Sequence, residues 1–593
     1  MDLAEGIYEA LPGLRWIRVL VLQPAMIVSD PLVAKFELQD LGPTLPTMPY
    51  SDSYHKNHPI QSKRLDDYQA LIDSCRLSYT ALSYSWAMED GQMHFNRDIE
   101  LDGRKRCITQ NLAEGLCEMR SVAGSLRFWV DALCIDQSNT AELNAQVAMM
   151  FDVYALAQRV DIWLGNGVLG DADYAIWYMA HYIEVNDLQG RRVIATDRNP
   201  FLACLDLFMR IDDEACCTPQ RCAFPHVDTP QDCSAKRRDT PSPRLGHHSR
   251  DDLLEWVDAE ASRTTHLQKM LSMKTRLVTC RYWSRRWVVQ ENYASAMTGG
   301  SRILYWAGYS ADASTMATLF DLLDSIESAL VRTRHHIPVA YDQAPAASSL
   351  LHCDVEELRL CSLLHLYSNT QCFDPRDRLY SLVALALNIN LEVNYNLSFS
   401  EVCLDFAKKL VKTGDFRMLI AAGHPRLEPL ISCPSWVPDV REPLLKNGGF
   451  QWEPYRMRAT VTDDDVLVLE THRLGKIVDA HIVDGDKQII AIEPDALELT
   501  NRSNRLGRLN IEFGVIALPG VWSEASEEDA LFCLCEGEAT RWYGSVLWLR
   551  PVSLELSTYR LMAATDICDF YEEVLQRKDH AVRQGSAVAI RLV

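Results

Sequence analysis

The sequence feature that most constrains the fold is the decapeptide FWVDALCIDQ at residues 128–137. Its apolar composition is typical of a strand that is buried on both faces of a parallel sheet, so we predict a strand over this segment. Asp131 conflicts with that environment, because an unpaired buried carboxylate is strongly destabilising. We therefore expect that the strand assignment is wrong or that the strand is built around a polar site.

The length and charge of the chain limit its organisation and its partners. A chain of 593 residues is too long for one hydrophobic core, and roughly three or four folding units are expected. The net charge of −22 repels a phosphate backbone, so nucleic acid is not expected as a partner. The apolar stretch at residues 16–28 contains Arg18 and Pro24 and is too short for a bilayer span, so we predict no signal peptide and no membrane span.

Eighteen cysteines raise the question of disulfides, but several, such as Cys134 and Cys403, lie inside apolar segments. We therefore expect reduced thiols and a cytoplasmic location. Residues 212–251 combine prolines, a basic triplet and paired cysteines without apolar periodicity, which predicts a disordered insertion. Zinc binding there is the less favoured alternative because no C-x-x-C spacing occurs, and no metal site is predicted.

Strand-like and helix-like segments alternate in the first part of the chain. Residues 79–84 read as a strand, residues 109–122 as a helix capped by Thr109, and residues 160–165 as a short strand after a further helix. This alternation is typical of a right-handed parallel α/β layer.

The remaining chain changes character twice. Residues 311–440 are expected to form a helical connecting region, with an amphipathic helix at 316–326 and a helix start at 374–380 that Asp374 caps. Capping is favoured over catalysis for Asp374. Short alternating runs predict a β-rich module over residues 441–593, with a helix near 567–576.

Three ordered blocks, YTALSYSW, FWVDALCIDQ with the following VDIWLG, and YWSRRWVVQE, resemble the HET (heterokaryon incompatibility) domain of filamentous fungi. The resemblance places this domain at residues 1–310. It implies a role in recognising non-self after cell fusion and in triggering cell death, with other incompatibility proteins or further copies of the chain as partners. Ala87 and Leu143 depart from the family pattern, which usually has a glycine and a basic residue at these positions.

HET domains in turn resemble TIR domains, some of which cleave NAD with a glutamate on a helix. This resemblance implies a TIR-like or flavodoxin-like doubly wound parallel sheet with helical insertions. TIR enzymes carry the glutamate four residues after a tryptophan, and Trp287 and Glu291 keep that spacing, although Ser284 lies one residue further away and the TIR cysteine is missing. The resemblance thus makes Glu291 the catalytic candidate and NAD a candidate substrate, with no other cofactor expected.

The carboxyl ends of strands in open α/β sheets form the usual ligand crevice. Two predicted strands end there in polar residues, and the helix that begins near Arg281 is expected to add more. The expected substrate-binding residues are Tyr84, Ser85, Trp86, Asp131, Asp136, Gln137, Arg285, Trp287 and Gln290. Aromatic rings suit a flat base, arginine suits phosphate, and carboxylates suit a ribose.

The same residues also have a structural interpretation. Glu291 can simply pair with Arg285 or Arg286, and Asp131 is expected to pair with a buried arginine such as Arg285 rather than to act directly. Cys134 has no identifiable histidine partner and is expected to be a packed thiol. The alternatives are therefore an NAD-cleaving death effector, a non-catalytic signalling module, or an inactive HET copy.

Overall fold

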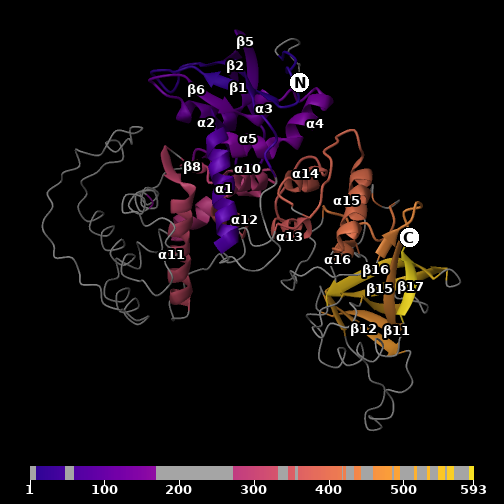
Figure 1. Ribbon diagram of the computed structural model, residues 1–593. Coiled ribbons are helices and arrows are strands. Elements are labelled where there is room, and N and C mark those ends of the chain that lie inside the picture. Colours follow the sequence, from indigo (N-terminus) through magenta and orange to yellow (C-terminus); the bar gives the residue numbers. More distant parts are fainter. Residues whose placement is uncertain are drawn as a thin grey trace. The chain divides into compact units, whose positions relative to one another are not determined.

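The computed structural model divides the chain into two compact units, Met1–Val355 and Glu356–Val593 (Figure 1). The described residues are 8–46, 59–167, 180, 271–306, 308–331, 345–353, 358–386, 388–416, 418–422, 430, 433–441, 459–483, 487–494, 513–516, 530–534, 545–553, 557–566 and 587–592. The predicted insertion at 212–251 and the predicted helix at 567–576 lie outside them. The HET domain boundary at residue 310 stays a prediction.

The first unit is built on a sheet whose described strands follow the order β5-β4-β2-β1-β6-β3-β7-β8-β9. Its four neighbouring central strands, β6, β3, β7 and β8, run parallel, as the alternating sequence pattern predicts. The sheet is nevertheless mixed, because β1 and β9 pair antiparallel with β6 and β8. The strands are β1 (Trp16–Leu22), β2 (Leu32–Asp40), β3 (Leu77–Tyr84), β4 (Phe95–Leu101), β5 (Arg104–Thr109), β6 (Leu126–Trp129), β7 (Ala157–Trp163), β8 (Ser301–Trp306) and β9 (Tyr309–Asp312).

Helices of the first unit connect and cover these strands (Figure 1). They are α1 (Pro59–Cys75), α2 (Gln110–Met119), α3 (Asp131–Cys134), α4 (Thr140–Ala148), α5 (Met150–Leu156), the 3₁₀ turn η1 (Arg281–Ser284), α10 (Val288–Met297), α11 (Ala313–Val331) and α12 (Pro345–His352). Thr109 caps α2 by accepting a hydrogen bond from the Leu112 N–H, which confirms the predicted cap. The amphipathic helix predicted at 316–326 lies within α11.

Helix α2 packs closely on β7 through a glycine. A Cβ atom at Gly115 would lie 3.0 Å from Cγ of the buried Trp163 ring. The same ring donates from Nε1 to Asn111 Oδ1 at 2.9 Å, and Asn111 Nδ2 donates to the Ser85 carbonyl at 2.6 Å. Asn111 therefore ties α2 to β7 and to the residue that follows β3.

The strand predicted over residues 128–137 is wrong, because β6 ends at Trp129 and α3 begins at Asp131. The Asp131 carboxylate lies in the first turn of this short helix, where it accepts the Ala132 N–H at 2.7 Å. A helix amino terminus favours a negative charge, whereas a strand interior does not. Leu133 and Cys134 are also buried, so the apolar run continues through the helix and conceals the change of structure.

The second unit combines helices with an antiparallel-rich sheet, which confirms the predicted β-rich module. Asp374 does not cap the predicted helix directly: its carboxylate accepts the Arg376 N–H at 2.9 Å, and α14 begins at Asp377. The described helices are α13 (Leu360–Leu366), α14 (Asp377–Val383), α15 (Phe399–Thr413) and α16 (Met418–Ala422). The described strands are β10 (Ala459–Val461), β11 (Leu467–Val483), β12 (Lys487–Pro494), β13 (Phe513–Ile516), β14 (Ala530–Leu534), β15 (Ser545–Ser553), β16 (Thr558–Asp566) and β17 (Ala587–Leu592).

None of the helices that the structure describes combines the length and the apolar composition needed to cross a membrane.

Candidate functional site

A polar cluster lies at the carboxyl ends of two adjacent parallel strands, β3 and β6. Thr80 pairs with Phe128 and Ala81 with Trp129, so both strands end at the same edge of the sheet. Trp86 follows β3 and Asp131 follows β6. The Trp86 Nε1 group donates to Asp131 Oδ2 at 3.0 Å, which joins the two strand ends.

Arg285 links this edge to helix α10. It lies between η1 and α10, and its Nη1 group donates to the Tyr84 carbonyl. Its Nη2 group lies 3.3 Å from Asp131 Oδ2, which confirms the predicted ion pair, and its Nη1 group lies 3.8 Å from Glu291 Oε1. One guanidinium therefore serves two carboxylates. The Arg285 and Asp131 side chains are 17% and 11% exposed while Glu291 is fully buried, so the cluster reaches solvent through Arg285 and Asp131 and is closed at Glu291.

Glu291 lies in the first turn of α10 and reaches the central strand β3. Its Oε2 atom accepts a hydrogen bond from the Ser83 hydroxyl, whereas Oε1 is buried without a hydrogen-bond partner among the described residues. Burial and the nearby Asp131 carboxylate raise the pKa of Glu291 to about 7, against the opposing effects of Arg285 and Ser83. Glu291 is therefore close to half protonated at neutral pH.

Aromatic side chains enclose the buried end of the cluster. The Arg285 guanidinium lies 5.9 Å from the centre of the Tyr84 ring, and the buried Tyr84 hydroxyl has no hydrogen-bond partner in the described part of the chain. Tyr154 of α5 donates to the Leu82 carbonyl at 3.2 Å, beside Ser83. Burial raises the pKa of both phenols, so both stay protonated across the physiological range.

Other residues expected at the site have separate positions. The exposed Gln137 side chain donates to the Asp131 carbonyl at 3.1 Å, so it contacts the backbone of the cluster only. Asp136 accepts from the backbone and the hydroxyl of Ser138, at 3.1 and 2.6 Å, within the turn after α3. The described contacts of Asp136 therefore do not join it to Arg285.

Three further expected residues lie directly after β3 or at the start of α10. Ser85 is 5% exposed and engages Asn111 through its carbonyl. Trp287 is half-buried immediately before α10, and Gln290 is 1% exposed in its first turn. The structure thus brings together Tyr84, Trp86, Asp131, Arg285 and Glu291 from the residues expected at the site.

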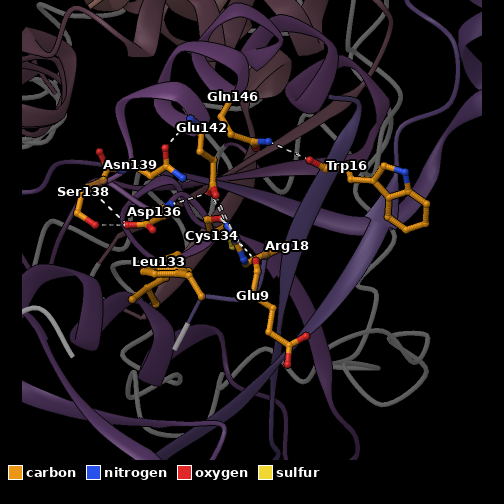
Figure 2. Close-up of polar contacts among 12 residues, drawn as sticks. Glu9, Trp16, Arg18, Leu133, Cys134, Asp136, Ser138, Asn139, Glu142 and Gln146 are labelled. Atoms are coloured by element: carbon orange, nitrogen blue, oxygen red, sulfur yellow. Dashed lines mark hydrogen bonds and ion pairs between the residues drawn. The ribbon is translucent and has the colours of Figure 1, made fainter. Parts of the chain in front are cut away.

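A second buried network holds the segment that carries Asp131 (Figure 2). Arg18 of β1 makes two contacts with the Glu142 carboxylate of α4, at 2.5 and 3.1 Å. Arg18 also donates to the carbonyls of Cys134 and Glu9, and Glu142 accepts the Asp136 N–H at 2.9 Å. The carboxyl end of α3 is therefore fixed by an ion pair, while its amino end presents Asp131.

Cys134 behaves as the packed thiol that the sequence predicts. It is fully buried, and its sulfur accepts the Val130 N–H at 3.3 Å. Burial raises the pKa of this thiol to about 12, so it does not form a thiolate at neutral pH.

Sequence reasoning did not identify Ser83, nor the two residues behind it: the Tyr282 hydroxyl lies 2.7 Å from the Ser83 hydroxyl and accepts from Asn292 Nδ2 at 2.8 Å. Ser83 is one of several hydroxyl-bearing residues in β3, together with Ser78 and Thr80, so its residue type is only a weak signal. Its contact with Glu291 joins positions 208 residues apart, so no spacing in the sequence reveals it. Among the described residues, no group of three or more histidine, cysteine, aspartate or glutamate side chains is placed to hold a metal ion.

Comparisons with known proteins agree with the motifs. Residues 79–199 match the family described as Heterokaryon incompatibility protein (HET). Over 100 residues the chain is 30% identical to "Heterokaryon incompatibility protein 6, OR allele" of Neurospora crassa, and this match spans 15% of each protein. No solved structure matches the chain. The chain therefore contains a segment, residues 79–199, that matches the heterokaryon incompatibility (HET) family.

Proposed function

We propose that this protein acts in heterokaryon incompatibility, and that its HET domain contributes to cell death by cleaving NAD at Glu291. The name of the Neurospora relative supports the first part, although the match covers only 15% of that relative. The second part rests on one observation: Arg285 joins the buried Glu291 to Asp131 and Trp86 at the carboxyl ends of β3 and β6. Ligands of open α/β sheets bind at this edge.

The chemistry requires little from the protein. The nicotinamide of NAD leaves the ribose as a neutral group, because it already carries a positive charge. A carboxylate beside the ribose stabilises the oxocarbenium-like transition state. Water then adds to the ribose carbon that nicotinamide has left, which gives ADP-ribose and a proton. Glu291 supplies this carboxylate, and its pKa of about 7 keeps a large ionised fraction at neutral pH.

Substrate binding must open the cluster, because Glu291 is fully buried. Arg285 provides the route: its side chain is 17% exposed, and its guanidinium is held by Asp131. The diphosphate of NAD replaces Asp131 as the partner of Arg285, since a guanidinium binds phosphate as well as carboxylate. Trp86, which is half-buried beside Asp131, then stacks on a flat ring of the substrate.

The direct test is nicotinamide release from NAD by the purified full chain. Glu291→Gln is expected to abolish release, because it removes the negative charge and keeps the shape of the side chain. Glu100→Gln, at an exposed position of β4, is the matched control and is expected to release nicotinamide at the wild-type rate. Equal rates for wild type and Glu291→Gln, or no release under any self-associating condition, would remove the enzyme proposal.

A second function, that of a non-catalytic assembly module, is favoured by the complete burial of Glu291. In this case the buried ion pairs only fix the fold of the edge, and self-association or binding of other incompatibility proteins carries the signal. Expression in a fungal host separates the two functions. Killing that survives Glu291→Gln supports assembly, whereas loss of killing by a folded Glu291→Gln protein supports catalysis.

A further inference from the structure

A second set of buried polar groups leads away from Glu291 toward helix α12. Its members are Ser83, Tyr282, Asn292 and Arg302, whose exposed fractions range from 0% to 6%. They come from β3, η1, α10 and β8, so elements distant in sequence meet in one line. Buried polar groups of this kind are strongly coupled, because the low local dielectric strengthens each hydrogen bond.

The hydrogen bonds of this line have one direction only. Asn292 Nδ2 donates to the Val288 carbonyl at 2.8 Å, and a carbonyl cannot donate in return, so the orientation of the amide is fixed. The second Nδ2 hydrogen is therefore donated to the Tyr282 hydroxyl oxygen at 2.8 Å, and Asn292 Oδ1 accepts from Arg302 Nη1 at 3.3 Å.

The hydrogen bonds between Tyr282 and the Glu291 carboxylate have the same direction. When Glu291 is ionised, the Ser83 hydroxyl uses its single hydrogen for Glu291 Oε2, so the 2.7 Å contact between Tyr282 and Ser83 has Tyr282 as donor. Every donor from Arg302 onward thus points toward Glu291. Such a chain favours the ionised carboxylate, since a proton on Oε2 would compete with the Ser83 hydrogen.

The chain begins at the carboxyl end of α12. Arg302 donates to the Leu350 and Leu351 carbonyls at 2.7 and 2.8 Å. Nη1 is shared among Leu350, Asn292 and the Cys353 sulfur, so its 3.3 Å bond to Asn292 is the weakest link. Cys353 ends this helical turn with a left-handed backbone, φ 48°, and the first unit ends two residues later in sequence.

We propose that Arg302 is a positioning residue for Glu291, acting through a one-directional chain of four hydrogen bonds that couples the carboxyl end of α12 to the Glu291 carboxylate. A displacement of α12 breaks the 3.3 Å hydrogen bond between Arg302 and Asn292. The remaining hydrogen bonds are then no longer polarised by Arg302. Its consequence for NAD cleavage rests on the proposed function, whereas the coupling itself does not.

The measurement follows the ionisation of Glu291 in the full chain without any substrate. For each background, calorimetric unfolding is compared with and without Glu291→Gln across pH, and the pH at which the difference levels off is the folded pKa of Glu291. Apart from Tyr282, the titratable and charged groups around this carboxylate, Arg285, Asp131, Tyr84 and Tyr154, stay unchanged in all variants. Arg302→Met is expected to move the levelling-off point upward by roughly half a pH unit, about threefold in proton binding.

Tyr282→Phe distinguishes a hydrogen-bond chain from direct electrostatic attraction. It removes one hydroxyl from the middle of the chain and leaves every contact of Arg302 in place. Alone it is expected to raise the levelling-off point, and in its background Arg302→Met is expected to add no further shift. An equal Arg302→Met shift in both backgrounds would overturn the proposal.

The proposal stays testable when Arg302→Met does not fold. In that case Tyr282→Phe alone tests the coupling, and an unchanged levelling-off point contradicts it. If the shifts occur but the protein does not cleave NAD, the coupling stands and the proposed function fails. If NAD is cleaved and the shifts are missing, the proposed function stands and the coupling fails.

Discussion

Glu291→Gln should make the protein more stable at alkaline pH, because burial makes ionisation of Glu291 unfavourable in the folded state. The pKa of this carboxyl rises from 4.5 to about 7 on folding. At about 1.4 kcal/mol per pH unit, this difference corresponds to about 3 kcal/mol. Glutamine keeps the shape and an oxygen that accepts from Ser83, but it does not ionise.

The sign of the effect follows from proton binding. Between pH 4.5 and about 7 the folded protein binds more protons at Glu291 than the unfolded chain does, so the stability of the wild type falls as pH rises through this range. Above about pH 7 the stability of the wild type no longer falls on account of Glu291. Relative to wild type, Glu291→Gln is therefore expected to gain about 3 kcal/mol of unfolding free energy between pH 4.5 and pH 8.

Denaturant unfolding of the full chain at several pH values measures this difference. Glu100→Gln, at an exposed position, is the control and should show no comparable gain. A stability difference between wild type and Glu291→Gln that does not change with pH would refute the reasoning. It would mean that Arg285 and Ser83 fully offset the burial of the carboxylate.

Three further substitutions test the packing of both units. Gly115→Ala should destabilise the first unit by about 1–3 kcal/mol in thermal unfolding, because its Cβ would press on Trp163; an unchanged midpoint would show that the ring moves aside. Glu142→Gln should cost about 3–5 kcal/mol in denaturant unfolding, because it leaves Arg18 buried without its counter-ion; a loss below about 1 kcal/mol would contradict a desolvated pair. Ser398→Ala should destabilise the second unit by about 1 kcal/mol through loss of the α15 capping box, and calorimetry should show no effect on the first unit.

Local patterns predicted most elements of the first unit that lie around the site. The β-branched and aromatic run before Ser85 is strand β3, and Thr109 caps α2, because these signals depend on neighbours in sequence. The strand prediction for residues 128–137 was wrong for a physical reason: α3 is short and buried, so its apolar run has no helical period.

Only those residues of the site that directly follow the ends of strands could be predicted from the sequence. Trp86 and Asp131 follow adjacent parallel strands, and the rule for open sheets places them together. Asp136 has other partners because the chain turns after α3 toward Glu142. The contact of Ser83 with Glu291 depends on the packing of α10 against β3, which no local pattern encodes.

The most direct test of Glu291 as the reacting carboxylate is the pH dependence of kcat/KM for NAD cleavage by the full chain. Cleavage is expected to rise about tenfold per pH unit below pH 7 and to level off above it, following the ionisation of Glu291. Glu291→Gln is expected to show no cleavage at any pH. A rate that does not depend on pH, or a profile that Glu291→Gln leaves unchanged, would contradict a catalytic role for this buried carboxylate.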